Sequence, residues 1–255
     1  MSSRLVALAL DTHHPARLAR FWAGVLDRAP IEQPRGVLLP GSPTQVGLRF
    51  APSDTRKAGL NRVHPHLTSD GPHGQRDTVA AALALGAHHL DVGQQPEERH
   101  IVLADPEGNE FCVIEPGNSY LAGCGFLGEL ACDGTRLVGL FWSEALGWPL
   151  VWDENEETAV QSPQGGTKVA WGGPPVAKKH GRNAQRFELA AADGDLAGEV
   201  DRLVALGATR LGSTKHGGVE LADPDGNEFC LTREEPRTPE GPARIGTSAT
   251  GIPQP

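Results

Sequence analysis

The chain has 255 residues, of which 38% are hydrophobic and 22% charged, a composition typical of a globular protein long enough for two domains. Its formal charge of −9 at pH 7 argues against general nucleic-acid binding, which requires a basic surface. No apolar run approaches the roughly 20 residues that cross a bilayer. The 4 cysteines show no CxxC spacing, which argues against a disulfide scaffold. We therefore expect a cytoplasmic protein that binds neither nucleic acid nor membrane.

The first elements expected are a strand and a helix. Residues 4–11 alternate apolar and other side chains with a period of two, which predicts a strand with one apolar face. A helix begins at Pro15, because proline suits the first turn and apolar residues then recur at helical spacing. Short strands are expected at 37–39 and 45–50, where alternation returns.

The same order of elements then occurs again. A strand is predicted at 63–68, a helix at 76–85, short strands after it, and a last strand at 110–114. Gly86 suits the position that follows the helix, because glycine tolerates a left-handed backbone. Each half of this unit is therefore a strand, a helix and three strands.

Sequence after residue 125 repeats the sequence before residue 115. DPEGNEFC at 105–112 returns as DPDGNEFC at 223–230, and Phe21-Trp22 returns as Phe141-Trp142. Such self-similarity indicates a duplicated domain.

We expect four regions along the chain. The domains span 4–115 and 125–235, and a Gly-rich linker at 116–124 joins them. The tail at 236–255 is rich in Pro, Gly and small polar residues, which predicts disorder.

The repeated octapeptide combines a turn with the start of a strand. Its DPxGN part forms a tight reversal, because proline fixes φ and Gly and Asn tolerate positive φ. Within the strand that follows, Glu110 and Cys112 share one face and Phe111 lies on the other. If Phe111 packs toward a helix, Glu110 and Cys112 face the open side of the sheet.

These repeats, each with a helix ending in ALGA before its DPxGNEFC motif, resemble the vicinal oxygen chelate superfamily. That group includes glyoxalases, bleomycin-resistance proteins and extradiol dioxygenases. The resemblance implies an α+β fold with two tandem glyoxalase-like domains, each of paired βαβββ units that form a cup-shaped mixed sheet. It also implies a small-molecule site inside the cup. In family enzymes a divalent metal ion, here possible as Zn, Ni, Fe or Mn, is held by the first and last strands of the halves.

The family's metal ligands do not all carry over to this chain. The acidic ligand position corresponds to Cys112 in the first repeat and Cys230 in the second. The histidine position corresponds to His64, which Arg186 replaces in the second repeat. On the first strands the position lies near Ala7 and near Leu127, where Gly128 and Glu129 are the neighbouring alternatives. The full family metal set is therefore not expected.

Alternation and the family's strand order predict the contents of the cups. The ligand-binding candidates are in the first repeat: Asp11, Gln45, Arg49, His64, His66, Glu110 and Cys112. Of these, His64 and Glu110 are catalytic candidates, and His64, Glu110 and Cys112 are the candidates for holding a metal ion. Arg186 is expected to pair with Glu188 or Glu228 in the second cup. A structural alternative treats both cysteines as small buried hydrophobes.

Two classes of function fit this sequence. The first is a protein of the bleomycin-resistance type that binds a small organic molecule without the full family metal site. The second is a glyoxalase-like lyase or isomerase, or a dioxygenase-related oxidoreductase, that uses His64 and Glu110. A nucleotide cofactor is not expected, because no phosphate-binding glycine loop occurs. The partner is a small molecule, and both a monomer and a homodimer remain open.

Overall fold

The structure is a computed structural model that describes residues 3–55, 57, 59–69, 74–95 and 97–233. Each repeat consists of two βαβββ halves. The first two halves contain β1 (Arg4–Thr12), α1 (Pro15–Leu26), β2 (Ile31–Gln33), β3 (Gly36–Leu39), β4 (Gly47–Pro52), β5 (Val63–Leu67), α2 (Gln75–Ala84), β6 (His88–His89), β7 (Ile101–Ala104) and β8 (Glu110–Val113). The last two contain β9 (Leu127–Cys132), α3 (Arg136–Leu146), β10 (Leu150–Glu154), β11 (Glu157–Gln161), β12 (Lys168–Trp171), β13 (Gln185–Ala191), α4 (Leu196–Ala205), β14 (Thr209–Ser213), β15 (Val219–Ala222) and β16 (Glu228–Arg233). The predicted elements are thus present in the predicted order.

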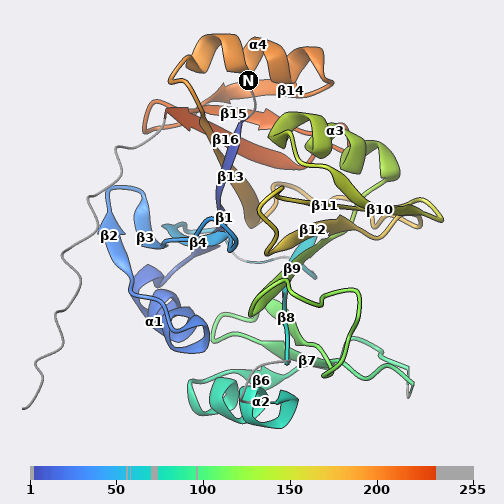
Figure 1. Ribbon diagram of the computed structural model, residues 1–255. Helices are drawn as coiled ribbons and strands as arrows, with labels where there is room; N and C mark the ends of the chain where they lie inside the picture. The colour runs from blue at the N-terminus through green and yellow to red at the C-terminus, as the bar shows by residue number, and fades with distance from the viewer. Residues whose placement is uncertain (1–2, 56, 58, 70–73, 96, 234–255) are drawn as a thin grey trace, which may run out of the picture.

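The described strands form two mixed sheets of eight strands each, which confirms the predicted α+β class. We name them by the halves that build them. The outer sheet joins the first and last halves of the chain in the order β14-β15-β16-β13-β1-β4-β3-β2. The inner sheet joins the two middle halves in the order β10-β11-β12-β9-β5-β8-β7-β6. In Figure 1 the blue strands of the chain start therefore lie beside the orange and red strands of its end.

The two halves of one repeat do not share a sheet, contrary to the grouping expected from sequence. β1 pairs antiparallel with β13, which places Ala7 beside Glu188. β5 pairs antiparallel with β9, which places His66 beside Glu129. Equivalent strands of the two repeats carry a similar alternation of apolar residues. The sequence pattern of a strand is therefore compatible with either of two pairing partners, and tertiary packing determines which one it pairs with.

The two halves of one repeat are instead held together by contacts between the helix of one half and the last strand and turn of the other. Trp22 of α1 packs edge-on against Phe111 of β8, with ring centroids 5.1 Å apart. Its indole nitrogen donates a hydrogen bond of 3.2 Å to Asp105. Trp142 repeats both contacts in the second repeat, at 5.0 Å from Phe229 and 3.3 Å from the carboxylate of the corresponding turn. In each repeat, the Phe-Trp pair of one half's helix therefore contacts the DPxGNEF segment of the other half and holds the two halves together.

The repeated DPxGN turn has the internal bonding that its sequence predicts. Asp105 Oδ1 accepts hydrogen bonds of 2.9 Å from the backbone nitrogens of Glu107 and Asn109, and Gly108 adopts φ +83°. Phe111 packs into the core, as expected, so the opposite face of β8 is the one that looks into the cup.

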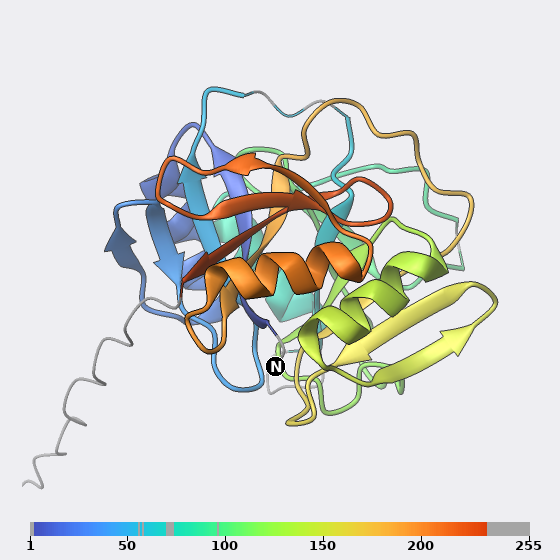
Figure 2. The same cartoon turned by 90° about the horizontal axis from the view of Figure 1, so that it is seen from above.

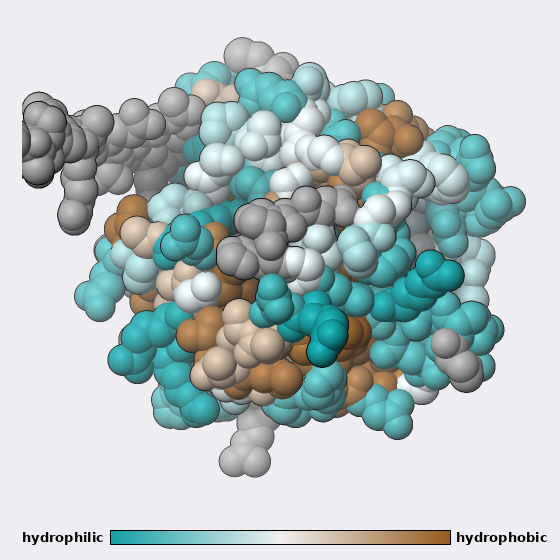
Figure 3. Space-filling view, turned by 60° about the horizontal axis from the view of Figure 1, so that its bottom comes forward, coloured by the Kyte–Doolittle hydropathy of each residue, from teal (hydrophilic) through white to brown (hydrophobic). Residues whose placement is uncertain are grey.

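Helices cover the core side of both sheets. Figure 2 shows α3 and α4 side by side, and Arg202 of α4 donates a hydrogen bond of 2.8 Å to the Ala145 carbonyl of α3. Among the described residues, no helix has the length and apolar character needed to cross a membrane. The face in Figure 3 is mixed, with an apolar area in its lower centre bordered by hydrophilic residues. The tail predicted at 236–255 lies outside the described residues.

Candidate functional site

A row of side chains crosses the inner sheet on the face that forms its cup. Directly paired strand residues point to the same face, so register alone defines the row. Its members, in strand order, are Val102, Cys112, His66, Glu129, Lys168 and Gln161. His64, two residues before His66 on β5, shares that face. We call this face the inner cup and its counterpart on the outer sheet the outer cup.

The centre of the row is a chain of short polar contacts. Glu129 lies between two donors: Nδ1 of His66 at 2.8 Å and the hydroxyl of Tyr120 at 2.8 Å. The ammonium of Lys168 lies 3.9 Å above the Tyr120 ring and donates to the Tyr120 carbonyl. The carboxylate of Glu129 is buried, with 6% of the residue exposed. The contacts therefore fix both the imidazole and the carboxylate in place.

Burial and these contacts set the charges in the inner cup. Burial alone would lower the pKa of His66, but hydrogen bonds with Cys112 and Glu129 outweigh it and raise that pKa to about 10. Burial and the neighbouring charge of His66 lower the pKa of His64 to about 4. Burial would raise the pKa of Glu129, yet its bonds with His66 and Tyr120 bring the pKa below its usual value. At neutral pH the cup holds an imidazolium, a neutral imidazole and a carboxylate.

His66 and Glu129 of the row line a cavity of about 500 Å³. Residues from β5, β9 and the segments that flank β7 and β8 line it: His66, Glu97, Arg99, His100, Ile114, Glu115, Asn118, Tyr120, Leu121 and Glu129. Trp152, which is 39% exposed, packs edge-on against Tyr120 with ring centroids 6.0 Å apart. The lining of the cavity is thus mainly polar and charged, and Ile114, Leu121 and Tyr120 are its apolar and aromatic members.

The predicted linker at 116–124 contributes directly to this wall. Leu121 and Cys124 are buried, with 2% and 1% exposed, and pack in an apolar cluster with Cys112. Tyr120 and Asn118 of the same segment line the cavity. The segment between the repeats is therefore part of the site as well as a connection.

Three of the predicted site residues come together in the inner cup. One donor atom from each of His64, His66 and Cys112 lies within 4.8 Å of the other two. The rings of the two histidines are 4.9 Å apart and tilted by 54°. Pro65 between them lies in β5, a central strand of the inner sheet. It lacks a backbone donor, and the pairing of β5 with β8 accordingly starts only at His66.

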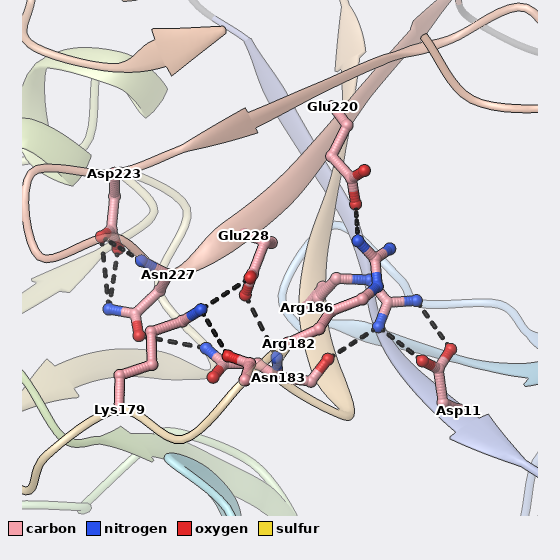
Figure 4. Close-up of polar contacts among 10 residues, drawn as sticks. Asp11, Lys179, Arg182, Asn183, Arg186, Glu220, Asp223, Asn227 and Glu228 are labelled. Carbon is pink, nitrogen blue, oxygen red and sulfur yellow. Dashed lines mark hydrogen bonds and ion pairs between the residues drawn. The ribbon is translucent and has the colours of Figure 1, made fainter. Parts of the chain in front are cut away.

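Glu110 does not join these three residues. Its carboxylate forms an ion pair with Lys57 and accepts a hydrogen bond of 3.2 Å from the Asn61 backbone nitrogen. The second repeat has the same arrangement, in which Glu228 pairs with Lys179 at 2.6 Å (Figure 4). An identical clamp in both repeats favours a structural role for Glu110, which fixes the loop before β5.

Asp11 and Arg49 lie in the outer cup, away from His64, because the outer sheet contains both β1 and β4. Arg49 is 1% exposed and donates to Glu188 at 2.6 Å. Asp11 accepts two hydrogen bonds of 2.7 Å from Arg186 (Figure 4). The expected partners of Arg186, Glu188 and Glu228, are thus taken by other cations.

Gln45 joins the two sheets at their margin. Its side-chain nitrogen donates to the Cys124 carbonyl at 2.8 Å, and its oxygen accepts from the Leu127 nitrogen at 3.0 Å. Gln45 therefore ties the first repeat to the start of β9 and does not line the inner cavity.

Sequence reasoning missed three residues of the inner cup. Glu129 was only a register alternative, although a carboxylate within the apolar strand 127–132 is a usable signal. Tyr120, the chain's one tyrosine, falls in the expected linker. Lys168 could not be placed, because the pairing of β12 with β9 depends on which halves share a sheet.

The family's four-ligand metal set does not fit the inner cup. The first and last strands of the two halves place Cys112, His66, Glu129 and Lys168 side by side. An ammonium at one of four ligand positions repels a cation, and it cannot donate an electron pair while protonated. His66 and Glu129 are also bonded to each other. No chemical step through a family-type metal centre follows from this set.

Known proteins share this architecture. The glyoxalase-like domain family matches residues 7–114 and 129–232. Glyoxalase I from Zea mays superposes with a TM-score of 0.63 at 13% identity, over 91% of this chain and 92% of that one. A putative dioxygenase from Bacillus subtilis subsp. subtilis str. 168 gives a TM-score of 0.60 at 12% identity, over 92% and 86% of the chains. No functionally curated protein matches the chain by sequence. With both repeats matched, the chain belongs to the glyoxalase-like family of the vicinal oxygen chelate superfamily.

Proposed function

We propose that the protein binds a small organic molecule in the inner cup. The observation that supports this most is a cavity of about 500 Å³ beside a row of polar side chains, a size typical of small-molecule sites. The four cysteines are free, which supports the expected reducing, cytoplasmic setting.

The residues of the cavity favour a mainly polar ligand with a smaller apolar part, because most of the lining is polar or charged. His66 offers a charged donor at the floor, and Glu129 offers a carboxylate acceptor beside it. Ile114 and Leu121 form apolar wall, next to the aromatic ring of Tyr120. A carbonyl or carboxyl group directed at His66 would be hydrogen-bonded, while a hydrocarbon or aromatic body would be removed from water by the wall.

A catalytic role is the second candidate, and the contrast between the two histidines favours it. His66 is protonated and His64 is neutral at pH 7, because their pKa values move in opposite directions. The His66 imidazolium could hydrogen-bond a bound carbonyl and stabilise negative charge that develops on it, and the His64 imidazole, with its ring centroid 4.9 Å away, could accept a proton, as a lyase or isomerase requires. Glu110 has no role in this catalytic proposal, because its carboxylate forms an ion pair with Lys57.

Thermal-shift screening of aldehydes, ketones, organic acids and phenols tests the binding proposal. Compounds that raise the Tm are then titrated by calorimetry into the wild type and into His100→Trp, which fills part of the cavity. We expect at least about tenfold weaker binding to the variant. Turnover of each hit, followed by NMR with wild type and His64→Gln, separates an enzyme from a binder.

The matched control is His216→Trp, in the exposed loop before β15 that corresponds to the loop before β7. It should bind every hit with wild-type affinity. Hits that bind equally well to both variants would place the ligand outside the inner cup and overturn the proposal.

A further inference from the structure

The inner cup places a thiol, an imidazole and a carboxylate in one line. Cys112 on β8 pairs in register with His66 on β5, and His66 pairs in register with Glu129 on β9. The three side chains therefore stand on the same face of adjacent strands, with the imidazole in the middle. A nucleophile, a base and a group that orients the base have this order in enzymes that form covalent intermediates.

Contacts connect these three groups. Nδ1 of His66 lies 2.8 Å from a carboxylate oxygen of Glu129, which leaves Nε2 for a second partner. His66 also forms a hydrogen bond with Cys112, and a ring nitrogen of His66 lies within 4.8 Å of Sγ. The hydroxyl of Tyr120 donates to the other carboxylate oxygen of Glu129 at 2.8 Å. Glu129 is thus held in place and in turn fixes the orientation of the imidazole.

We propose that Cys112 is a nucleophile that takes up the acyl group of a small carboxylic ester, with His66 as its proton partner and Glu129 as a positioning residue. An imidazole beside a thiol favours the thiolate, which is the reactive form. The thiolate attacks the acyl carbon, a C–S bond forms, the ester C–O bond breaks, and the imidazolium gives its proton to the leaving alkoxide. Water then attacks the thioester with the imidazole as base, and the C–S bond breaks. The net reaction is hydrolysis of the ester to an acid and an alcohol.

His64 supplies a hydrogen-bond donor for the acyl oxygen. One of its ring nitrogens lies within 4.8 Å of both Cys112 Sγ and a ring nitrogen of His66. Burial lowers the pKa of His64 to about 4, so at pH 7 its imidazole is neutral and carries one N–H. A donor beside the nucleophile stabilises the negative charge that develops on the acyl oxygen during attack.

The thiol lies directly behind the wall of the cavity. Leu121 and Ile114 line the cavity and also belong to the apolar cluster that contains Cys112. His66 lines the cavity as well. Because Cys112 is only 4% exposed, an electrophile has to enter the cavity to reach Sγ. The inference thus rests on the proposed function only through the choice of this cavity.

Release of 4-nitrophenolate from 4-nitrophenyl acetate, followed by stopped flow with the full-length chain, tests the nucleophile. We expect a burst of about one equivalent per chain, the kinetic sign of an acyl-enzyme. Peptide mass spectrometry should find the acetyl group that forms during the burst on Cys112. Cys112→Ser should abolish the burst and the adduct, and His66→Gln should slow the burst on the order of 100-fold.

Glu129→Gln tests the positioning role. The variant should slow the burst and move the alkaline limb of its pH profile to lower pH, because a carboxylate no longer favours the imidazolium of His66. A merely structural role for Glu129 would reduce the amount of folded protein and leave the pH profile where it is.

Cys230→Ser is the matched control, because Cys230 ends the same motif in the second repeat but pairs in register with Glu188 instead of a histidine. It should retain both the burst and the adduct on Cys112. The proposal is overturned if the wild type gives no burst, if the acetyl group lies away from Cys112, or if both serine variants behave alike. Circular dichroism confirms the folding of each variant. If Cys112→Ser does not fold, His66→Gln and the position of the acetyl group in the wild type decide the question.

The two proposals can fail separately. Organic compounds that bind the cavity, in a chain that gives no burst, would remove the nucleophile and leave the binding function. An acetyl group on Cys112, in a chain that binds none of the screened compounds, would do the reverse.

Discussion

The two cups of this molecule occupy equivalent places in the two sheets but differ in what fills them. In the inner cup, adjacent strands carry Cys112, His66, Glu129 and Lys168. The corresponding positions in the outer cup are Cys230, Glu188, Ala7 and Gly47. The thiol is retained in both, while the rest of the row is replaced.

Arginine side chains occupy the outer cup. Arg49 is almost fully buried and bonds Glu188 at 2.6 Å and Gln33 at 2.6 Å. Arg186 holds Asp11 through two bonds of 2.7 Å. The outer cup is thus filled by buried ion pairs, whereas a cavity lies beside the row of the inner cup.

The largest expected effect comes from breaking the ion pair of the outer cup. Arg49→Met removes the main partner of a buried carboxylate, and the free energy of unfolding should fall by about 3–5 kcal/mol in urea denaturation. Glu188 then keeps a longer ion pair of 3.5 Å with Arg35. Adding Glu188→Leu removes this weakly paired charge, so the double variant should recover most of that loss.

Arg136→Met provides the comparison for an exposed pair. Arg136 bonds Asp153 at 2.6 and 2.7 Å, but both side chains lie at the surface. The free energy of unfolding of Arg136→Met should not differ measurably from that of the wild type.

The contradicting outcome concerns the outer cup. If Arg49→Met with Glu188→Leu is as unstable as Arg49→Met alone, packing of the arginine stem, and not charge, stabilises the outer cup.

The second prediction concerns Cys230, the outer-cup counterpart of Cys112. Burial, with a further contribution from Glu188, raises the pKa of Cys230 to about 11, from an ordinary 9.0. A pKa about two units higher lowers the thiolate fraction at pH 8 on the order of 100-fold. Alkylation of Cys230 should be slower than in the denatured chain by the same factor. Peptide mass spectrometry after timed iodoacetamide labelling measures this. Labelling of Cys230 at the denatured rate would contradict it.

Local structure was largely predictable from the sequence, because it depends on neighbours along the chain. Alternation located the strand at 4–11, proline located the start of α1 at Pro15, and Gly86 adopts the expected positive φ of +109°. Alternation in the strand after DPxGN also predicted that Phe111 packs into the core, on the face opposite Glu110 and Cys112. These features require no knowledge of distant contacts.

The choice of sheet partners could not be predicted, and it decides the site. β1 accepts β13 as readily as β5 by pattern, since both candidates alternate in the same way. Grouping halves within a repeat therefore put Asp11 and Arg49 beside His64, whereas they lie in different sheets. Glu110 faces the cup, but its pairing with Lys57 depends on a loop 53 residues earlier in the chain.

The smallest expected effect concerns the clamp that both repeats share, tested in the outer sheet. Burial raises the pKa of Glu228, but the bonds from Lys179 and the Asn183 backbone outweigh burial, so the pKa lies below its ordinary value of 4.5. The unfolded chain then binds this proton more readily than the folded chain, and the stabilisation present at neutral pH is lost as pH falls through the folded pKa. Lys179→Met should lower the free energy of unfolding by at most about 1 kcal/mol at pH 7, because the pair is partly exposed to solvent. At pH 3 the difference from wild type should shrink toward zero in urea denaturation, while the exposed neighbour variant Lys178→Met should match wild type at both values. A difference that stays constant with pH would mean that Lys179 acts through packing, and the clamp would not be electrostatic in either repeat.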